Sequence, residues 1–160
     1  MPISATKTHA TPSPITSAWL RALRTYLGFI LVVNLLWEIF HLPLYMIWQT
    51  GSLREQVVAV IHCTLGDLLI AVSTLTLALV IAGDGGWPAR RAWQVAALTI
   101  LFGVSYTIYS EWVNVVVRAT WAYSEWMPTI TISSFRVGVS PLLQWILVPA
   151  AAALIAHRRG

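Results

Sequence analysis

The chain has 160 residues, of which 58% are hydrophobic and only 10% are charged. Soluble domains carry about 25% charged residues, so this composition, with a mean hydropathy of +0.72, excludes an ordinary soluble protein and indicates that lipid is the solvent. The net charge of +4 comes from basic residues at the ends of apolar runs, which form no nucleic-acid-binding patch. The single cysteine, Cys63, excludes an intrachain disulfide.

We expect an all-α fold, an integral membrane four-helix bundle that forms one transmembrane domain over residues 21–160. Residues 1–20 contain prolines among Ser, Thr and Ala, which predicts a disordered cytoplasmic tail. The apolar stretch that follows is too long for a cleavable signal sequence. The spans are predicted at about residues 25–48, 57–82, 93–117 and 137–156.

The first predicted span carries a polar stripe of Asn34, Glu38, His41 and Tyr45, at positions i, i+4, i+7 and i+11. On a helix these side chains face one side. A charged side chain at the centre of a bilayer costs about 2.5–3.5 kcal/mol on insertion scales, so this side cannot face lipid. The stripe therefore predicts a polar site in the interior of the bundle.

Two later spans and one connecting segment carry further polar residues. The second span has His62, Cys63 and Asp67 in its first half, and the third has a stripe of the same period as the first. The third-span stripe consists of Thr107, Glu111, Asn114 and Arg118. Residues 119–136 are too apolar for a free loop, and Pro128 prevents a continuous helix. We expect this segment to be interfacial or re-entrant and to carry Glu125.

The distribution of basic residues predicts the orientation. With four spans, both termini and the turn at about residues 83–92 share one side. That side holds Lys7, Arg21, Arg24, Arg90, Arg91, Arg158 and Arg159, whereas the other holds Arg54, Arg118 and Arg136. The positive-inside rule then places both termini in the cytoplasm and the candidate acids and histidines in the outer half of the membrane.

The residue types favour a metal-dependent membrane enzyme as the first hypothesis. Glu38, His41, His62 and Asp67 are ligand types suited to a divalent transition metal such as iron, zinc, manganese or copper. Glu38 and His41 match one Glu-x-x-His half-motif, although di-iron bundles use two. Glu111 or Glu125 would act as general acid or base on a lipid or another apolar substrate.

The same residues also fit a protein without catalytic activity. In this alternative the acids pair with histidine in a subunit of a membrane complex or in a small proton- or cation-coupled transporter. Each residue also has a structural interpretation, with the histidines as packing residues, Glu111 and Glu125 as solvated interface residues, and Cys63 as a small buried residue. A two-acid site like that of small aspartyl signal peptidases is disfavoured, because the Asn and Asp-Arg contexts are missing. The sequence leaves open whether the protein is an enzyme or a homo-oligomer.

Several strings over about residues 28–150 resemble those of an uncharacterised family of small bacterial four-span integral membrane proteins. These strings are WEIFHLPLY, HCTLGD, SEW followed by WAYSEWMP, and GVSPLLQW. The resemblance implies the four-span architecture and a multi-pass location in the bacterial inner membrane. It implies no activity.

Overall fold

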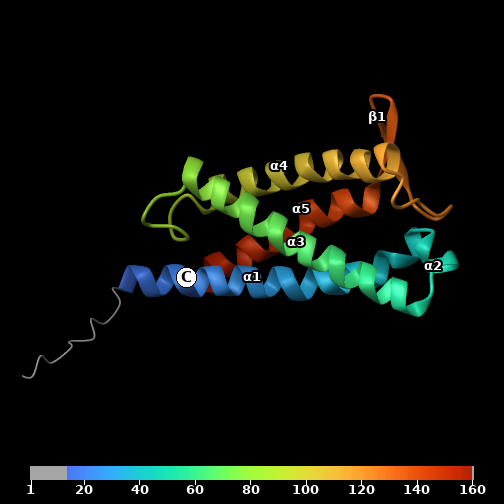
Figure 1. The fold of residues 1–160 in the computed structure, drawn as a ribbon. Coiled ribbons are helices and arrows are strands. Elements are labelled where there is room, and N and C mark those ends of the chain that lie inside the picture. Colours follow the sequence, from blue (N-terminus) through green and yellow to red (C-terminus); the bar gives the residue numbers. More distant parts are fainter. Residues whose placement is uncertain (1–13, 160) are drawn as a thin grey trace, which may run out of the picture.

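The computed structural model describes residues 14–159, so most of the predicted tail lies outside the described part. Four long helices run side by side in alternating directions (Figure 1). They are α1 (Pro14–His41), α3 (Leu53–Ala82), α4 (Ala92–Glu111) and α5 (Val139–Arg159). Four segments are long and apolar enough to cross a membrane, as predicted. These segments are Ala18–Leu44, Leu53–Ala82, Ala92–Val117 and Val139–Arg158.

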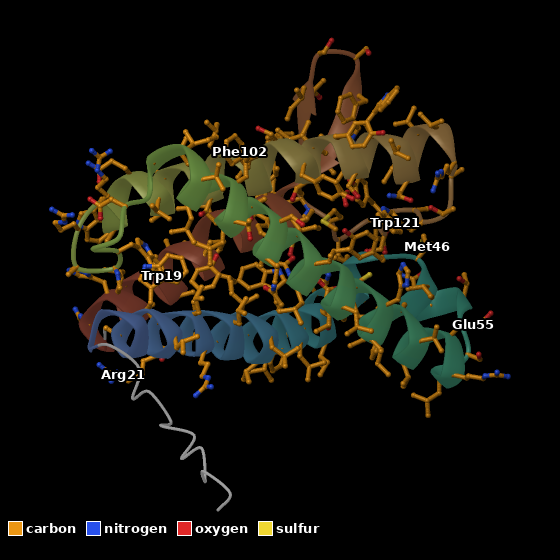
Figure 2. The ribbon with its side chains drawn as sticks, turned by 60° about the vertical axis from the view of Figure 1, so that its left-hand side comes forward. Trp19, Arg21, Met46, Glu55, Phe102 and Trp121 are labelled. Atoms are coloured by element: carbon orange, nitrogen blue, oxygen red, sulfur yellow. The ribbon has the colours of Figure 1, made fainter. Side chains whose placement is uncertain are left out.

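The two ends of the bundle differ. Both ends of the described chain and the loop between α3 and α4 lie at one end, here called the terminal end (Figure 1). The opposite end, called the hairpin end, holds α2 (Ile47–Thr50) and a two-stranded sheet of β1 (Thr129–Ile132) and β2 (Phe135–Gly138). In Figure 2, Trp19 and Arg21 mark the terminal end and Trp121 and Glu55 the hairpin end.

Helix α1 both begins and ends earlier than the predicted first span. It begins at Pro14, inside the predicted tail, because proline is well tolerated in the first turn of a helix and Arg21 and Arg24 do not interrupt helical geometry. It ends at His41 and continues as a 3-10 turn, η1 (Leu42–Leu44), because Pro43 disfavours a regular helix. The backbone of Tyr45 is therefore extended, at φ −116° and ψ 148°. Contrary to the prediction, Tyr45 does not continue the helical stripe.

Helix α3 begins at a capping box. The Ser52 hydroxyl accepts a hydrogen bond from the Glu55 amide, and the Glu55 carboxylate accepts one from the Ser52 amide at 2.7 Å. These two bonds satisfy amide groups that have no partner within the helix. The start of the second span at Leu53 rather than near residue 57 follows from this cap.

The second polar stripe is only half formed. Thr107 and Glu111 are buried on α4, but the chain then changes to a π-helical segment, η2 (Trp112–Val117). There the Arg118 amide bonds the Val113 carbonyl five residues back, at 2.8 Å. This wider turn changes the angular spacing of the side chains around the helix. Arg118 is therefore exposed and, contrary to the prediction, does not lie on the same face as Glu111.

Residues 118–128 lie across the hairpin end and pair with residues 44–46, at the end of η1 and just after it. The Met46 amide bonds the Ala122 carbonyl and the Ser124 amide bonds the Leu44 carbonyl, both at 2.9 Å. The β-hairpin follows, with Thr129 opposite Gly138 and Ile132 opposite Phe135. The all-α prediction is wrong at this point, because the alternating β-branched sequence Thr-Ile-Thr-Ile has the two-residue period of a strand.

The surface of the bundle is apolar along the helices. Phe40, Leu69 and Val80 are each at least two-thirds exposed, and such side chains would face water at high cost in a soluble protein. The interior of the terminal half is an apolar core that includes Tyr26, Ile30, Leu75, Trp87, Val95 and Val148. The outward apolar face is therefore the face that lipid covers.

Gly103 allows α4 and α5 to approach closely. A Cβ atom on Gly103 would overlap the ring of Trp145, whereas one on Gly28 would meet no atom within 4 Å. We expect Gly103→Ala to destabilise the protein by about 1–3 kcal/mol through overpacking, and Gly28→Ala to be neutral or stabilising because alanine favours helix. Unfolding of both variants in mixed micelles tests this, and equal stabilities would contradict it.

Candidate functional site

Six buried polar residues from three helices form a connected group in the interior, here called the polar cluster. Each has at most 9% of its surface exposed. They are Asn34, Glu38 and His41 from α1, Asp67 from α3, and Ser140 and Gln144 from α5. Asp67 lies near the middle of α3 and His41 is the last residue of α1, so the cluster extends from mid-bundle toward the hairpin end.

Gln144 connects the three helices. Its amide nitrogen Nε2 lies 2.8 Å from Asp67 Oδ2, 3.1 Å from Glu38 Oε1 and 3.3 Å from Asn34 Oδ1. The carboxyl groups of Glu38 and Asp67 therefore share one donor and lie close enough to interact electrostatically. One side-chain amide therefore holds two acids and an amide oxygen from two other helices.

His41 uses both ring nitrogens. Nε2 lies 3.1 Å from Glu38 Oε2, and Nδ1 lies 3.0 Å from the Ser140 hydroxyl oxygen. The same hydroxyl accepts a hydrogen bond from Trp37 Nε1 at 3.2 Å. Because a hydroxyl can both donate and accept, Ser140 can pair with either the neutral or the protonated imidazole. This arrangement fixes the ring of His41 without fixing its charge.

Glu111 forms a second acidic position beside the cluster. It is buried, and its carboxylate accepts a hydrogen bond from the Tyr123 hydroxyl. The Tyr123 oxygen in turn accepts from the Gly138 amide at 2.9 Å. Burial, together with the bond to Glu111, raises the pKa of the Tyr123 phenol above its ordinary value, so Tyr123 is a neutral donor at physiological pH.

Tyr45 lies between these two acidic positions. Its ring centroid is 5.4 Å from that of His41 and 5.7 Å from that of Tyr123. Burial, followed by the nearby Glu111 carboxylate, raises the pKa of the Tyr45 phenol well above its ordinary value. Tyr45 therefore reaches the site through its pairing with Tyr123, although it does not lie on the predicted helical stripe.

The structure separates two of the six candidate residues from the others. His62 is exposed on α3 and Glu125 is exposed in the segment before β1. His62 and Asp67 are five residues apart, which is about 140° around a helix, so they face different directions. Cys63 is half-buried and lies beside Glu38 and Asp67. Within residues 14–159, no three side chains of His, Cys, Asp and Glu are placed to hold a metal ion.

The sequence did not indicate the roles of Gln144, Ser140, Trp37 and Tyr123. The available signal was a lone glutamine in an otherwise apolar span, in the string GVSPLLQW. Polar residues inside a membrane bundle tend to bond across helices, so this glutamine marks an interhelical contact once its span is recognised. Tyr123 carried no such signal, because its contact with Glu111 depends on the path of residues 118–128.

The fold and the cluster define an integral membrane protein with buried Glu, His and Asp side chains. No protein family model, curated protein or solved structure matches the chain. No family is thereby identified, and the four long apolar helices are the part of the predicted resemblance that the structure supports.

Proposed function

We propose that the polar cluster binds and releases protons within the membrane and that the protein is a small proton-coupled transporter. One observation carries this proposal, namely that Gln144 is the shared hydrogen-bond donor to two acids. The Gln144 amide has two hydrogens but three oxygen acceptors within 3.3 Å. A proton shared between Glu38 and Asp67 supplies the missing hydrogen.

The balance of charges supports the same conclusion. Glu38, Asp67 and Glu111 are buried, and His41 is the group beside them that can become positive. Among the described residues, the arginines that form ion pairs are Arg90 and Arg91, and both pair with Asp84 in the loop at the terminal end. Three buried negative charges facing one positive charge would be strongly unfavourable inside a membrane, so protons must neutralise part of this charge.

The contacts of His41 provide a route by which a proton can leave the acid pair. In the neutral imidazole, Nδ1–H donates to the Ser140 hydroxyl and Nε2 accepts the hydrogen of the protonated Glu38 carboxyl. When Glu38 passes this proton to Nε2, the imidazolium donates from both ring nitrogens, to the Glu38 carboxylate and to Ser140, and the partners keep their positions. Beyond His41 lie Tyr45 and the Tyr123–Glu111 pair, which extend the polar groups toward the hairpin end.

The distribution of arginine supports a cytoplasmic location for the terminal end and thus for both termini. Arg21, Arg24, Arg90, Arg91 and Arg158 belong to that end, whereas Arg54, Arg118 and Arg136 belong to the hairpin end. Under the positive-inside rule, the polar cluster then lies toward the outer leaflet of a cell membrane.

Proton binding is tested by infrared spectroscopy and by flux. We expect the wild-type protein to show the carbonyl stretching band of a protonated, buried carboxylic acid. This band should disappear in Glu38→Gln and in Asp67→Asn. It should remain in the control Glu125→Gln, because the Glu125 side chain is exposed. In liposomes loaded with a pH indicator, the first two variants should abolish proton movement and Glu125→Gln should leave it unchanged. A band that persists in both cluster variants would contradict the shared proton.

A metal-dependent membrane enzyme acting on a lipid or another apolar substrate is the second candidate. The observation in its favour is that Glu38 contacts His41 and shares the Gln144 amide with Asp67, with Glu111 close enough to act on His41 electrostatically. Iron, zinc, manganese or copper would be the metal. Stoichiometric metal in the purified protein that is lost in His41→Ala would favour this candidate over proton transport.

A further inference from the structure

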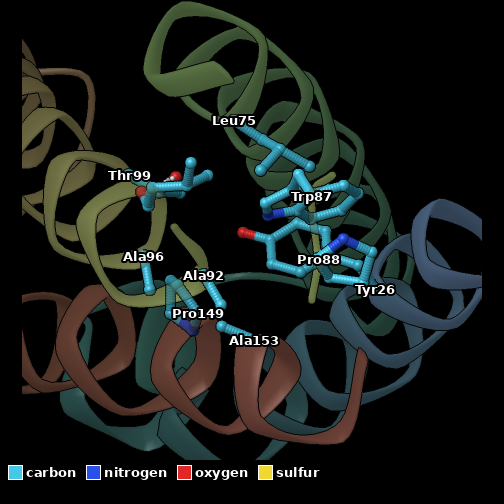
Figure 3. A pocket seen from close by; sticks show the side chains of 10 residues that line it. Tyr26, Leu75, Trp87, Pro88, Ala92, Ala96, Thr99, Pro149 and Ala153 are labelled. Atoms are coloured by element: carbon cyan, nitrogen blue, oxygen red, sulfur yellow. Dashed lines mark hydrogen bonds between the residues drawn. The ribbon is translucent and has the colours of Figure 1, made fainter. Parts of the chain in front are cut away.

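Tyr26 has a buried hydroxyl without a partner. It lies on α1 in the terminal half, with 2% of its surface exposed, and its hydroxyl oxygen forms no hydrogen bond within the part of the chain that the structure describes. Buried hydroxyl groups are nearly always paired, with protein or with ordered water. The hydroxyl points into a space enclosed by α3, α4, α5 and the loop that carries Trp87 (Figure 3).

This space is a cavity of about 10 Å³, which is close to the smallest volume that holds one water molecule. Leu75, Trp87 and Val95 supply apolar walls. Thr99 also lines the cavity, and its hydroxyl donates its hydrogen to the Val95 carbonyl at 2.9 Å. The lone pairs of the Thr99 oxygen therefore remain able to accept.

Pro149, which lies inside α5, completes the apolar wall of the cavity together with Ala153. Tyr26 and Thr99 are therefore a donor and an acceptor on the wall of the same small space.

We propose that this cavity is a binding site for a single structural water molecule. The water accepts the Tyr26 hydroxyl hydrogen and donates to the Thr99 oxygen, which gives it two partners, within the range of about two to four for a buried water. The site is separate from the polar cluster. On the inward face of α1, Ile30 lies between Tyr26 and Asn34 and is fully buried, so one apolar layer separates the water from the acids.

The stability of Tyr26→Phe distinguishes a hydrated cavity from a dry one. If water is bound, the variant deprives it of a donor, and the midpoint of thermal unfolding in detergent should fall by a few degrees. If the cavity is dry, Tyr26→Phe removes an unpaired buried hydroxyl, and the midpoint should stay or rise. Tyr106→Phe is the matched control, because Tyr106 is 47% exposed, and it should leave the midpoint unchanged.

A double-mutant cycle gives a second, independent measure. Tyr26 and Thr99 share no direct hydrogen bond, so a hydrogen-bonded link between their hydroxyl groups requires a group between them. With a bridging water, the destabilisation in Tyr26→Phe/Thr99→Val should be smaller than the sum of the two single effects. Additive effects, or a structure at high resolution without density in the cavity, would overturn the proposal.

Discussion

Gln144→Leu is expected to destabilise the folded protein by about 3 kcal/mol, the upper end of the cost of leaving a buried acceptor unpaired. Leucine preserves most of the volume of glutamine but cannot donate a hydrogen bond. The oxygens of Asn34, Glu38 and Asp67 would lose their shared donor, and each of them is buried. The measurement is reversible unfolding in mixed micelles, at a pH where the wild-type protein is folded.

The control for this prediction is the same substitution at a position without such contacts. Gln94 lies on α4 and is exposed, so Gln94→Leu makes the same chemical change on the outer face and should alter stability by less than about 0.5 kcal/mol. If Gln144→Leu is as stable as Gln94→Leu, Gln144 does not link the three helices. The proton-sharing pair would then lose its main support.

Gln144→Leu should also change how the acids behave in transport. Without the amide, the Glu38–Asp67 pair keeps its shared proton but loses the donor that compensates its remaining charge. We therefore expect proton movement to slow even in molecules that remain folded. Comparing flux per folded molecule with that of Gln94→Leu separates this effect from loss of protein.

The sequence was sufficient to predict features that depend on local periodicity. Asn34, Glu38 and His41 share a buried face because α1 stays helical through His41. The same reasoning failed at Tyr45 and at Arg118, where η1 and the π-helical η2 replace regular α-helix. Pro43 was an unused signal of the first change, whereas the stretch Trp112–Val117 contains no residue that marks a π-helix.

Features that depend on contacts between distant segments were not predictable from the pattern. Glu111 was open to interpretation as a solvated interface residue, but the chain folds back so that Tyr123 covers it. His62 shares a span with Asp67 yet faces outward, because helix rotation separates positions five apart. A single sequence indicates which residues are costly to expose to lipid, but it does not reveal which partners satisfy them.

Tyr123→Phe is expected to destabilise the protein by about 1–3 kcal/mol at neutral pH. The phenol is a donor to the buried Glu111 carboxylate and an acceptor for the Gly138 amide, and phenylalanine leaves both groups unpaired. Tyr109→Phe is the matched control, because Tyr109 is 58% exposed on α4. Equal stabilities of the two variants would show that the hairpin-end segment does not hold Glu111.

The penalty of Tyr123→Phe should also depend on pH in a defined direction. Burial raises the pKa of the Tyr123 phenol above the value of 10.0 that it has in the unfolded chain. The stabilisation from the neutral phenol is therefore fully present below about pH 10 and is lost as the pH rises toward the folded pKa, because the unfolded chain then releases the proton first. The difference in unfolding free energy between wild type and Tyr123→Phe should thus be constant from pH 7 to about pH 9 and shrink above pH 10. A difference that grows above pH 10 would mean that the phenol ionises more easily in the folded protein, which a bond from Tyr123 to a buried carboxylate does not allow.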